Sequence, residues 1–184
     1  MKTSLTFTPS ISPLALPFVV IVALVAFGAP LRAQDVWVGN GVTQNWSDGN
    51  NWQSGTPPVS DDDIQFQGSN NTSPNQDFGA GFPVVSVTFN SNAASFDLVG
   101  NAIGFFAIGG SNTIENDSPT DQTFDLTNNG GVGGAGIVFG GVPGFINATN
   151  GNIIINCNIE LENFGGGADL TFDGAFKTTV NGSI

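Results

Sequence analysis

The chain has 184 residues, and its 15 acidic residues against three lysines and arginines give a formal net charge of −12. Such a surface repels nucleic acid and anionic lipid, because both are bound through Lys and Arg, so we expect no nucleic-acid partner. The chain has no histidine and no tyrosine, which removes the commonest general base, and its single cysteine excludes a disulfide-stabilised fold.

Residues 1–33 have the features of an export signal. Lys2 supplies a positive start, and Leu14–Ala29 is an almost unbroken apolar run of 16 residues. A spanning helix needs about 20 such residues, so a cleaved signal is favoured over an uncleaved anchor. We expect cleavage between Ala33 and Gln34, and export to the extracellular space or cell surface. The mature chain then has 15 acids against Lys177 alone, a net charge of −14, and we expect no membrane insertion by it.

Residues 34–63 contain all three tryptophans, Trp37, Trp46 and Trp52, among Asn, Gly, Ser and Pro. An exposed tryptophan can stack on a sugar ring, whereas a buried one can cover the end of a core and donate its indole N–H to a backbone carbonyl. Stacked β-coils need such a cover at their first edge. We therefore predict an N-terminal cap made by these tryptophans, with glycan stacking by the same residues as the alternative.

Three consecutive acids, Asp61, Asp62 and Asp63, end this segment. Carboxylates bind calcium, but a calcium loop spaces its ligands along a turn, whereas consecutive acids alternate in direction and repel one another. We therefore predict a solvated turn that leads into a strand at Ile64, and no metal site.

Residues 64–184 alternate apolar and polar side chains, as half-buried β-strands do. The longest alternation runs from Ile153 to Glu162, with Ile, Cys and Leu on one face and Asn and Glu on the other. Shorter alternations occur at 64–66, 85–89, 96–98, 124–126 and 170–172. No segment has helical spacing with caps, so we predict an all-β chain with almost no helix.

Four of these segments share a pattern in which an apolar residue stands two before a phenylalanine and Gly or Asn follows. The phenylalanines are Phe66, Phe89, Phe139 and Phe172, at intervals of 23, 50 and 33 residues. These intervals are not a strict period, but a stack of similar coils leaves such a pattern. We therefore predict a parallel β-solenoid over 64–184. Short strands at irregular spacing also fit an antiparallel β-sandwich, which stays the alternative.

Three features resemble catalytic or cofactor-binding motifs, but the residues around each of them argue against that role. Gly131–Gly136 (GVGGAG) has the spacing of a dinucleotide fingerprint, but the following Gly and Pro would break the required helix, so we predict a turn between strands. Glu160 and Glu162 lie beside Asn on a polar strand face, where we expect solvent to keep both ionised. Cys157 lies on the apolar face without a histidine to activate it, so we predict a buried thiol. We expect no catalytic residue, no cofactor and no enzyme; a polysaccharide-degrading β-helix enzyme is a third hypothesis.

The order of residues in 36–68 strongly resembles the amino-terminal segment of autotransporter-associated β-strand repeat proteins, which are large exported bacterial proteins frequent among planctomycetes and verrucomicrobia. The later segments 85–103 (VSVTFNSNAASFDLVGNAI) and 124–131 (FDLTNNGG) look like the first coils of the same proteins. The matching features are Trp37, Gly39, Trp46, Ser47, Asn51, Trp52, Gly55, Pro57, Pro58, Asp62 and Phe66.

This resemblance implies a right-handed parallel β-helix on the cell surface or in the exported fraction, with no catalytic residue to carry over. We therefore expect a non-enzymatic structural or adhesive passenger segment, with coils that are incomplete at the C-terminus and the rest of a longer passenger protein as a partner. Extracellular or cell-surface polysaccharide is the expected ligand class, and outer-membrane association would need a C-terminal anchor in the full gene. The alternative is a secreted carbohydrate-binding β domain that uses Trp37, Trp46 and Trp52.

Overall fold

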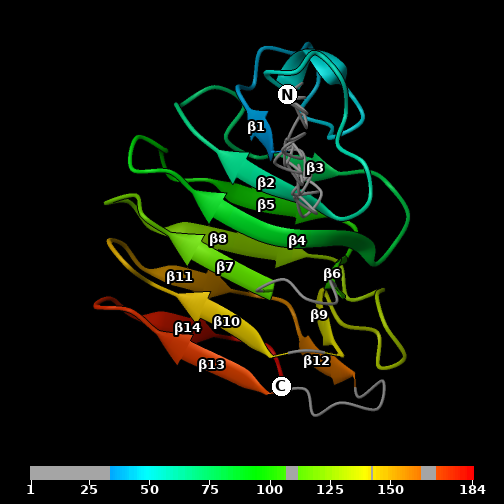
Figure 1. Cartoon of the computed structure of the whole chain (residues 1–184), viewed down its shortest axis with the longest axis vertical. Helices are drawn as coiled ribbons and strands as arrows, with labels where there is room; N and C mark the ends of the chain where they lie inside the picture. The colour runs from blue at the N-terminus through cyan, green and yellow to red at the C-terminus, as the bar shows by residue number, and fades with distance from the viewer. Residues whose placement is uncertain (1–33, 107–111, 142, 163–168) are drawn as a thin grey trace, which may run out of the picture. The chain divides into compact units, whose positions relative to one another are not determined.

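The computed structural model describes residues 34–106, 112–141, 143–162 and 169–184 (Figure 1). The predicted export signal, residues 1–33, lies outside the described residues. The structure is all-β, with 45% strand and 2% helix, which confirms the predicted near-absence of helix. The helix is the short 3-10 turn η1 (Gly49–Asn51). The strands are β1 (Gln34–Trp37), β2 (Asp62–Phe66), β3 (Asn75–Gln76), β4 (Phe82–Phe89), β5 (Asp97–Gly100), β6 (Ile103–Phe105), β7 (Asn112–Asn116), β8 (Gln122–Leu126), β9 (Ile137–Gly140), β10 (Gly144–Asn147), β11 (Ile153–Ile155), β12 (Ile159–Glu162), β13 (Leu170–Asp173) and β14 (Thr178–Val180).

The twelve ladders between these strands are all parallel. The larger sheet has the order β12-β9-β6-β4-β7-β10-β13, with β2 paired to β4 and β1 to β2. The smaller sheet has the order β14-β11-β8-β5-β3. An antiparallel β-sandwich requires antiparallel ladders, and the described strands form none, so that alternative is wrong for this part of the chain.

The long strand β4 divides the larger sheet into two stacks. Its residues Phe82–Val84 pair with β6, and Ser86–Phe89 pair with β7. The chain repeats one path through three strands: β5, β6 and β7, then β8, β9 and β10, then β11, β12 and β13. We call one such turn of the chain a circuit. Each strand pairs with its counterpart in the preceding circuit (Figure 1). Paired residues are 21 apart at Phe82 and Ile103 but 34 apart at Ile103 and Ile137. The phenylalanines of the predicted pattern also belong to different columns: Phe66 pairs with Phe89, whereas Phe139 pairs with Phe105 and Phe172 with Ile146, so their intervals have no common period.

Inward side chains form columns that continue from one circuit to the next. The phenylalanine rings also stack between circuits, with centroids 5.3 Å apart for Phe66 and Phe89 and 4.7 Å apart for Phe105 and Phe139. Burial of these apolar groups is the main source of stability. One column consists of residues that pair in sequence and are all fully buried: Ile64, Val87, Ile114 and Ile146.

The long alternation between Ile153 and Glu162 is two strands rather than one. β11 pairs with β8 in the smaller sheet, whereas β12 pairs with β9 in the larger sheet, and the chain turns a corner between them. The inward positions stay buried through Cys157 and Ile159, but Leu161 is exposed, because none of the described strands pairs with the outer edge of β12. Leu161 pairs with the fully buried Phe139, so it keeps the predicted inward face, but its side chain is 37% exposed.

Asparagine side chains connect equivalent turns of successive circuits. The amide of Asn75 donates to Asn45 at 2.8 Å, and that of Asn129 donates to Asn101 at 3.0 Å. The amide of Asn181 donates to Asn156 at 2.8 Å in the same way. Each of these bonds joins residues 25 to 30 positions apart, so the Asn-rich composition serves the contact between circuits as well as the turns.

Candidate functional site

The three tryptophans gather at the first circuit. The ring of Trp52 meets those of Trp37 and Trp46 edge to face, with centroids 5.1 and 5.7 Å apart. Trp46 also contacts Phe66 and Phe82. The exposed fractions of the three side chains are 0%, 1% and 2%. Glycan stacking needs an exposed ring face, and none of the three tryptophans offers one, so the structure contradicts that use of these residues.

The chain folds back to cover the outer edge of β1. Backbone N–H groups of Val38 and Gly39 donate to the carbonyl of Asn51, and the N–H of Gln53 donates to the carbonyl of Val36. The indole N–H of Trp52 donates to the carbonyl of Trp46 at 2.7 Å. The first strand of the larger sheet therefore has a partner on both sides.

The buried amide of Asn51 holds this covering segment together. Its Nδ2 donates to the carbonyls of Thr43 and Asn45, and its Oδ1 accepts from the N–H of Gly41. Asp48 stands before η1 and accepts from the N–H of Asn50. These bonds satisfy the backbone of a segment that has almost no regular structure, as a buried segment requires.

The predicted boundary between a cap (34–63) and coils (64–184) falls inside β2. β1 belongs to the cap segment but pairs in register with β2, so Trp37 lies opposite Phe66. The covering segment and the first circuit therefore share one sheet and one core.

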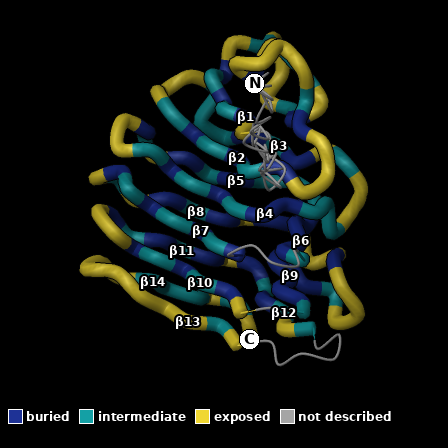
Figure 2. The backbone as a smooth tube through the Cα atoms, in the orientation of Figure 1, coloured by how far each residue is buried: buried dark blue, intermediate teal, exposed yellow. Residues whose placement is uncertain are grey.

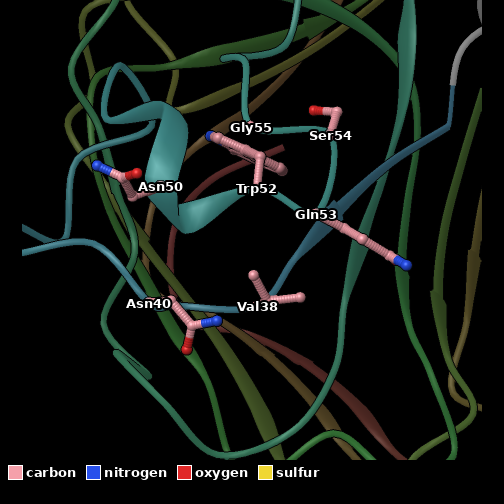
Figure 3. A pocket seen from close by; sticks show the side chains of 7 residues that line it. All are labelled: Val38, Asn40, Asn50, Trp52, Gln53, Ser54 and Gly55. Atoms are coloured by element: carbon pink, nitrogen blue, oxygen red, sulfur yellow. The ribbon is translucent and has the colours of Figure 1, made fainter.

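A shallow hollow of about 510 Å³ opens beside Trp52 (Figure 3). None of its lining residues is charged, and its amide side chains can each donate and accept hydrogen bonds. The amide of Gln53 bonds to no other described side chain or backbone group. These properties suit a neutral ligand rich in hydroxyl groups. The lining residues are Val38, Asn40, Asn50, Trp52, Gln53, Ser54 and Gly55.

The predicted solvated turn at Asp61–Asp63 is wrong for two of its three residues. Asp61 is exposed with a left-handed backbone, φ 68°, but Asp62 and Asp63 belong to β2. Asp62 is only 6% exposed, accepts from the N–H of Val59 at 2.8 Å and lies against Asp35, which is 7% exposed. Paired strands thus bring two carboxyl groups together on the inward face.

Burial raises the pKa of Asp35 to about 6, and both a hydrogen bond with Asp62 and the charge of Asp62 act in the same direction. A hydrogen bond from Ser54 Oγ, 3.2 Å from Asp35 Oδ1, opposes them. The folded protein therefore keeps a proton on Asp35 at a pH where the unfolded chain has lost it.

We expect the free energy of unfolding to fall as the pH rises from about 4 to about 6, because the unfolded Asp35 loses its proton first. Asp35→Asn should remove the part of this dependence that Asp35 contributes and stabilise the protein above pH 6 by about 1–2 kcal/mol. Urea unfolding followed by tryptophan fluorescence across this pH range measures both effects. Asp48→Asn is the control: hydrogen bonds lower the pKa of Asp48, so this change should not stabilise the protein at pH 7. An unchanged pH dependence in Asp35→Asn would contradict the assignment.

The glycine-rich segment forms the predicted turn between β8 and β9. Gly130 and Ala135 exchange two backbone hydrogen bonds of 2.8 Å across it. The N–H of Val132 donates to Glu162 at 2.9 Å, and the N–H of Gly133 donates to Glu160 at 2.7 Å. The two glutamates therefore bind the turn of the preceding circuit, which corrects the prediction that they simply face solvent.

Cys157 is a free, buried thiol, as predicted. Burial raises its pKa to about 11, so the thiol stays protonated and unreactive at neutral pH.

Sequence reasoning missed Asp35 and the amides around the hollow, and it assigned Asn51 no structural role. Asp35 precedes Trp37 by two, so it shares the inward face of its strand, and this parity is the signal that could have found it. The hollow has no such signal, because it forms only when 51–55 lies beside 38–40.

No family model, curated protein or solved structure matches the chain. In the described ranges, no three His, Cys, Asp or Glu side chains are grouped so that they could hold a metal ion. Among the same residues, no helix is long and apolar enough to cross a membrane. Because no known protein or structure matches the chain, the family resemblance rests on the sequence alone.

Proposed function

We propose that this chain is a non-enzymatic structural and adhesive passenger segment of an exported, autotransporter-like surface protein. Its fold in this proposal is a right-handed parallel β-helix, with Trp37, Trp46 and Trp52 as the cap of the first coil. The observation that carries the proposal is the repeated circuit of parallel strands, in which each inward column continues from one circuit to the next.

A passenger segment has to be rigid and soluble. The ladders, the asparagine bonds between turns and the buried phenylalanines support rigidity, because each circuit is fixed to its neighbours by both hydrogen bonds and packing. The net charge supports solubility. Each repeated circuit adds length without changing the cross-section of the core, which is the property a surface spacer needs.

The absence of enzyme activity is part of the proposal. Glu160 and Glu162 bind the backbone of a turn, and the Cys157 thiol is buried. A carboxylate that already accepts structural hydrogen bonds is poorly placed to exchange protons with a substrate. The hypothesis of a polysaccharide-degrading enzyme has no support in these contacts.

Carbohydrate binding is the second candidate function, and the uncharged hollow beside Trp52 favours it. In this form it relies on the amides of Asn40, Asn50 and Gln53 rather than on stacking by the tryptophans. Extracellular or cell-surface polysaccharide is the matching class of ligand.

One preparation tests both proposals. All 184 residues are expressed in a Gram-negative host, and the cell fractions are analysed by mass spectrometry. The passenger proposal expects an exported product that begins at Gln34; a cytoplasmic product that retains Met1 contradicts it.

The purified product is then titrated with neutral oligosaccharides and followed by NMR. Saturable shifts at the neighbouring Ser54 and Gly55 that Gln53→Ala abolishes, and that the exposed Asn150→Ala keeps, support the second function. Without such shifts the hollow is not a carbohydrate site.

A further inference from the structure

Residues 54–60, which we call the strap, connect the two buried carboxyl groups of Asp35 and Asp62. At one end Ser54 Oγ donates to Asp35 Oδ1 at 3.2 Å, and at the other end the N–H of Val59 donates to Asp62 Oδ2 at 2.8 Å. Each end of the strap is therefore held by one of the two carboxyl groups. If these groups move apart, the two ends of the strap have to follow.

The two halves of the strap differ in how firmly they are held. Residues 54–56 are exposed, whereas Pro58 is buried, and the adjoining strand β2 alternates between buried and intermediate residues (Figure 2). Pro57 and Pro58 also stiffen the half next to β2, because a proline ring fixes its backbone φ angle. The strands cannot yield easily, since β1 has backbone partners on both sides and β2 pairs with β1 and β4. A change at the carboxyl pair is therefore passed to residues 54–56.

This exposed half of the strap forms one wall of the hollow beside Trp52. Ser54 and Gly55 both line the hollow, and Figure 3 shows them along one side of it. The carbonyl of Gly55 also lies against η1, where a Cβ atom on Gly49 would come within 2.6 Å of its oxygen. A shift of the wall away from η1 therefore changes the shape of the hollow.

The neighbouring acids do not belong to this buried pair. Asp61 is exposed, and Asp63 lies on the other face of β2, where it accepts from Ser86 Oγ at 2.7 Å. Asp48 accepts from the N–H of Asn50 at the start of η1. The two buried carboxyl groups therefore form a pair of their own.

No positive side chain of the described residues compensates the pair. Residues 51–60, beside β1, contain no charged side chain, and neither does β4, the other neighbour of β2. The only Lys or Arg in the described ranges is Lys177, which lies between β13 and β14. Two ionised carboxylates would repel each other in a poorly solvated place, so the pair retains one proton. The pKa of Asp35, which burial and Asp62 raise to about 6, agrees with this arrangement.

We propose that the Asp35–Asp62 pair is a proton-controlled latch on the strap. While the pair holds its proton, the carboxyl groups stay together and residues 54–56 lie against η1. When the proton passes to water, the Asp35 carboxylate turns outward, residues 54–56 move away from η1, and the hollow loses the shape seen in Figure 3. Movement of the strap is a property of the fold alone, whereas control of ligand binding rests on the carbohydrate function proposed above.

NMR of the purified protein without ligand tests the latch between pH 4.5 and pH 8. The amide shifts of Ser54 and Gly55 should change with a midpoint near pH 6. The Cα of Thr56 would lie 3.4 Å from a Cβ on Gly49, so the nuclear Overhauser contact between residues 49 and 56 reports the position of the wall. We expect this contact to weaken as the pH rises through 6.

Three variants identify the group responsible. Asp35→Asn keeps the size of the side chain but has no proton to lose, so it should hold the contact between Gly49 and Thr56 at every pH. Asp61→Asn is the matched control: it removes an exposed carboxyl group beside the pair, at a left-handed position that Asn tolerates, and should leave the midpoint unchanged. Ser54→Ala should raise the midpoint, because the hydrogen bond from Ser54 lowers the pKa of Asp35. This surface change decides the question if Asp35→Asn fails to fold.

A contact between Gly49 and Thr56 that stays constant from pH 4.5 to pH 8 overturns the latch, even where the amide shifts titrate, because shifts alone can report a nearby charge. The latch is equally overturned by a transition that Asp35→Asn keeps or that Asp61→Asn removes. A midpoint that Ser54→Ala leaves unchanged also contradicts it.

Titration with neutral oligosaccharides at pH 5 and pH 7 separates the latch from the carbohydrate function. The protonated fraction of Asp35 falls from about nine-tenths to about one-tenth between these values, so the apparent dissociation constant should rise about tenfold. Binding that is equally tight at both pH values overturns the control of the hollow. Absence of binding at both contradicts the carbohydrate function alone, because the contact between Gly49 and Thr56 decides the latch without any ligand.

Discussion

Replacing Trp52 with alanine should lower the free energy of unfolding by about 3–5 kcal/mol, the range for deleting a large buried aromatic side chain. Trp52 contacts both other tryptophans and is 2% exposed, so the cavity would lie at the centre of the cluster. Its indole N–H also holds the carbonyl of Trp46 at 2.7 Å. Urea unfolding followed by circular dichroism measures the loss.

Two phenylalanine variants separate packing from hydrogen bonding in this cluster. Trp52→Phe keeps an aromatic ring but leaves the buried carbonyl of Trp46 without its donor. The missing hydrogen bond should lower the free energy of unfolding by about 1–3 kcal/mol, in addition to the decrease caused by the smaller ring. The indole N–H of Trp46 is buried and has no partner in the described structure, so Trp46→Phe removes no hydrogen bond. We therefore expect Trp52→Phe to be the more destabilising change. Equal losses, or a larger loss for Trp46→Phe, would show that the bond between these residues contributes nothing.

Alternation predicted which side chains face inward but not which stack they belong to. Ile153, Ile155, Cys157 and Ile159 are all buried, although the chain changes sheets between them. At the corner between β11 and β12 every second side chain still points inward, so the alternation of apolar and polar residues continues through the corner and does not reveal it. Pairing partners depend on loop lengths that vary from circuit to circuit, so the order of strands could not be predicted from the pattern.

The sequence predicted the parts of the candidate site that depend on the type of a single residue, but not the parts that depend on contacts between distant residues. The tryptophans identified the first circuit because their size and spacing are visible in the sequence. Asp62 shows the opposite case: three consecutive acids indicate a solvated turn, yet strand pairing places Asp62 against Asp35 and away from water. Contacts between residues 27 positions apart, like the hollow beside Trp52, exist only after the circuit closes.

Gly39→Ala should lower the free energy of unfolding by about 2–5 kcal/mol in total, from backbone strain and from overpacking. Gly39 follows β1 with φ 62°, a left-handed conformation that costs any residue with a Cβ atom. An added Cβ would also overlap the backbone carbonyl oxygen of Asn70, which cannot move as a flexible side chain would. The change would push apart the first circuit and the loop that lies against it.

Gly68→Ala is the matched control for this change. Gly68 has nearly the same backbone angle, φ 70°, but nothing lies within 4 Å of the position a Cβ would take. The free energy of unfolding of Gly68→Ala should therefore fall only by the cost of the left-handed conformation, about 1–2 kcal/mol. The difference between the two variants in urea unfolding isolates the close approach of Gly39 to Asn70. If both lose the same stability, the two backbone segments are not held in contact, and the first circuit is less tightly closed than its hydrogen bonds indicate.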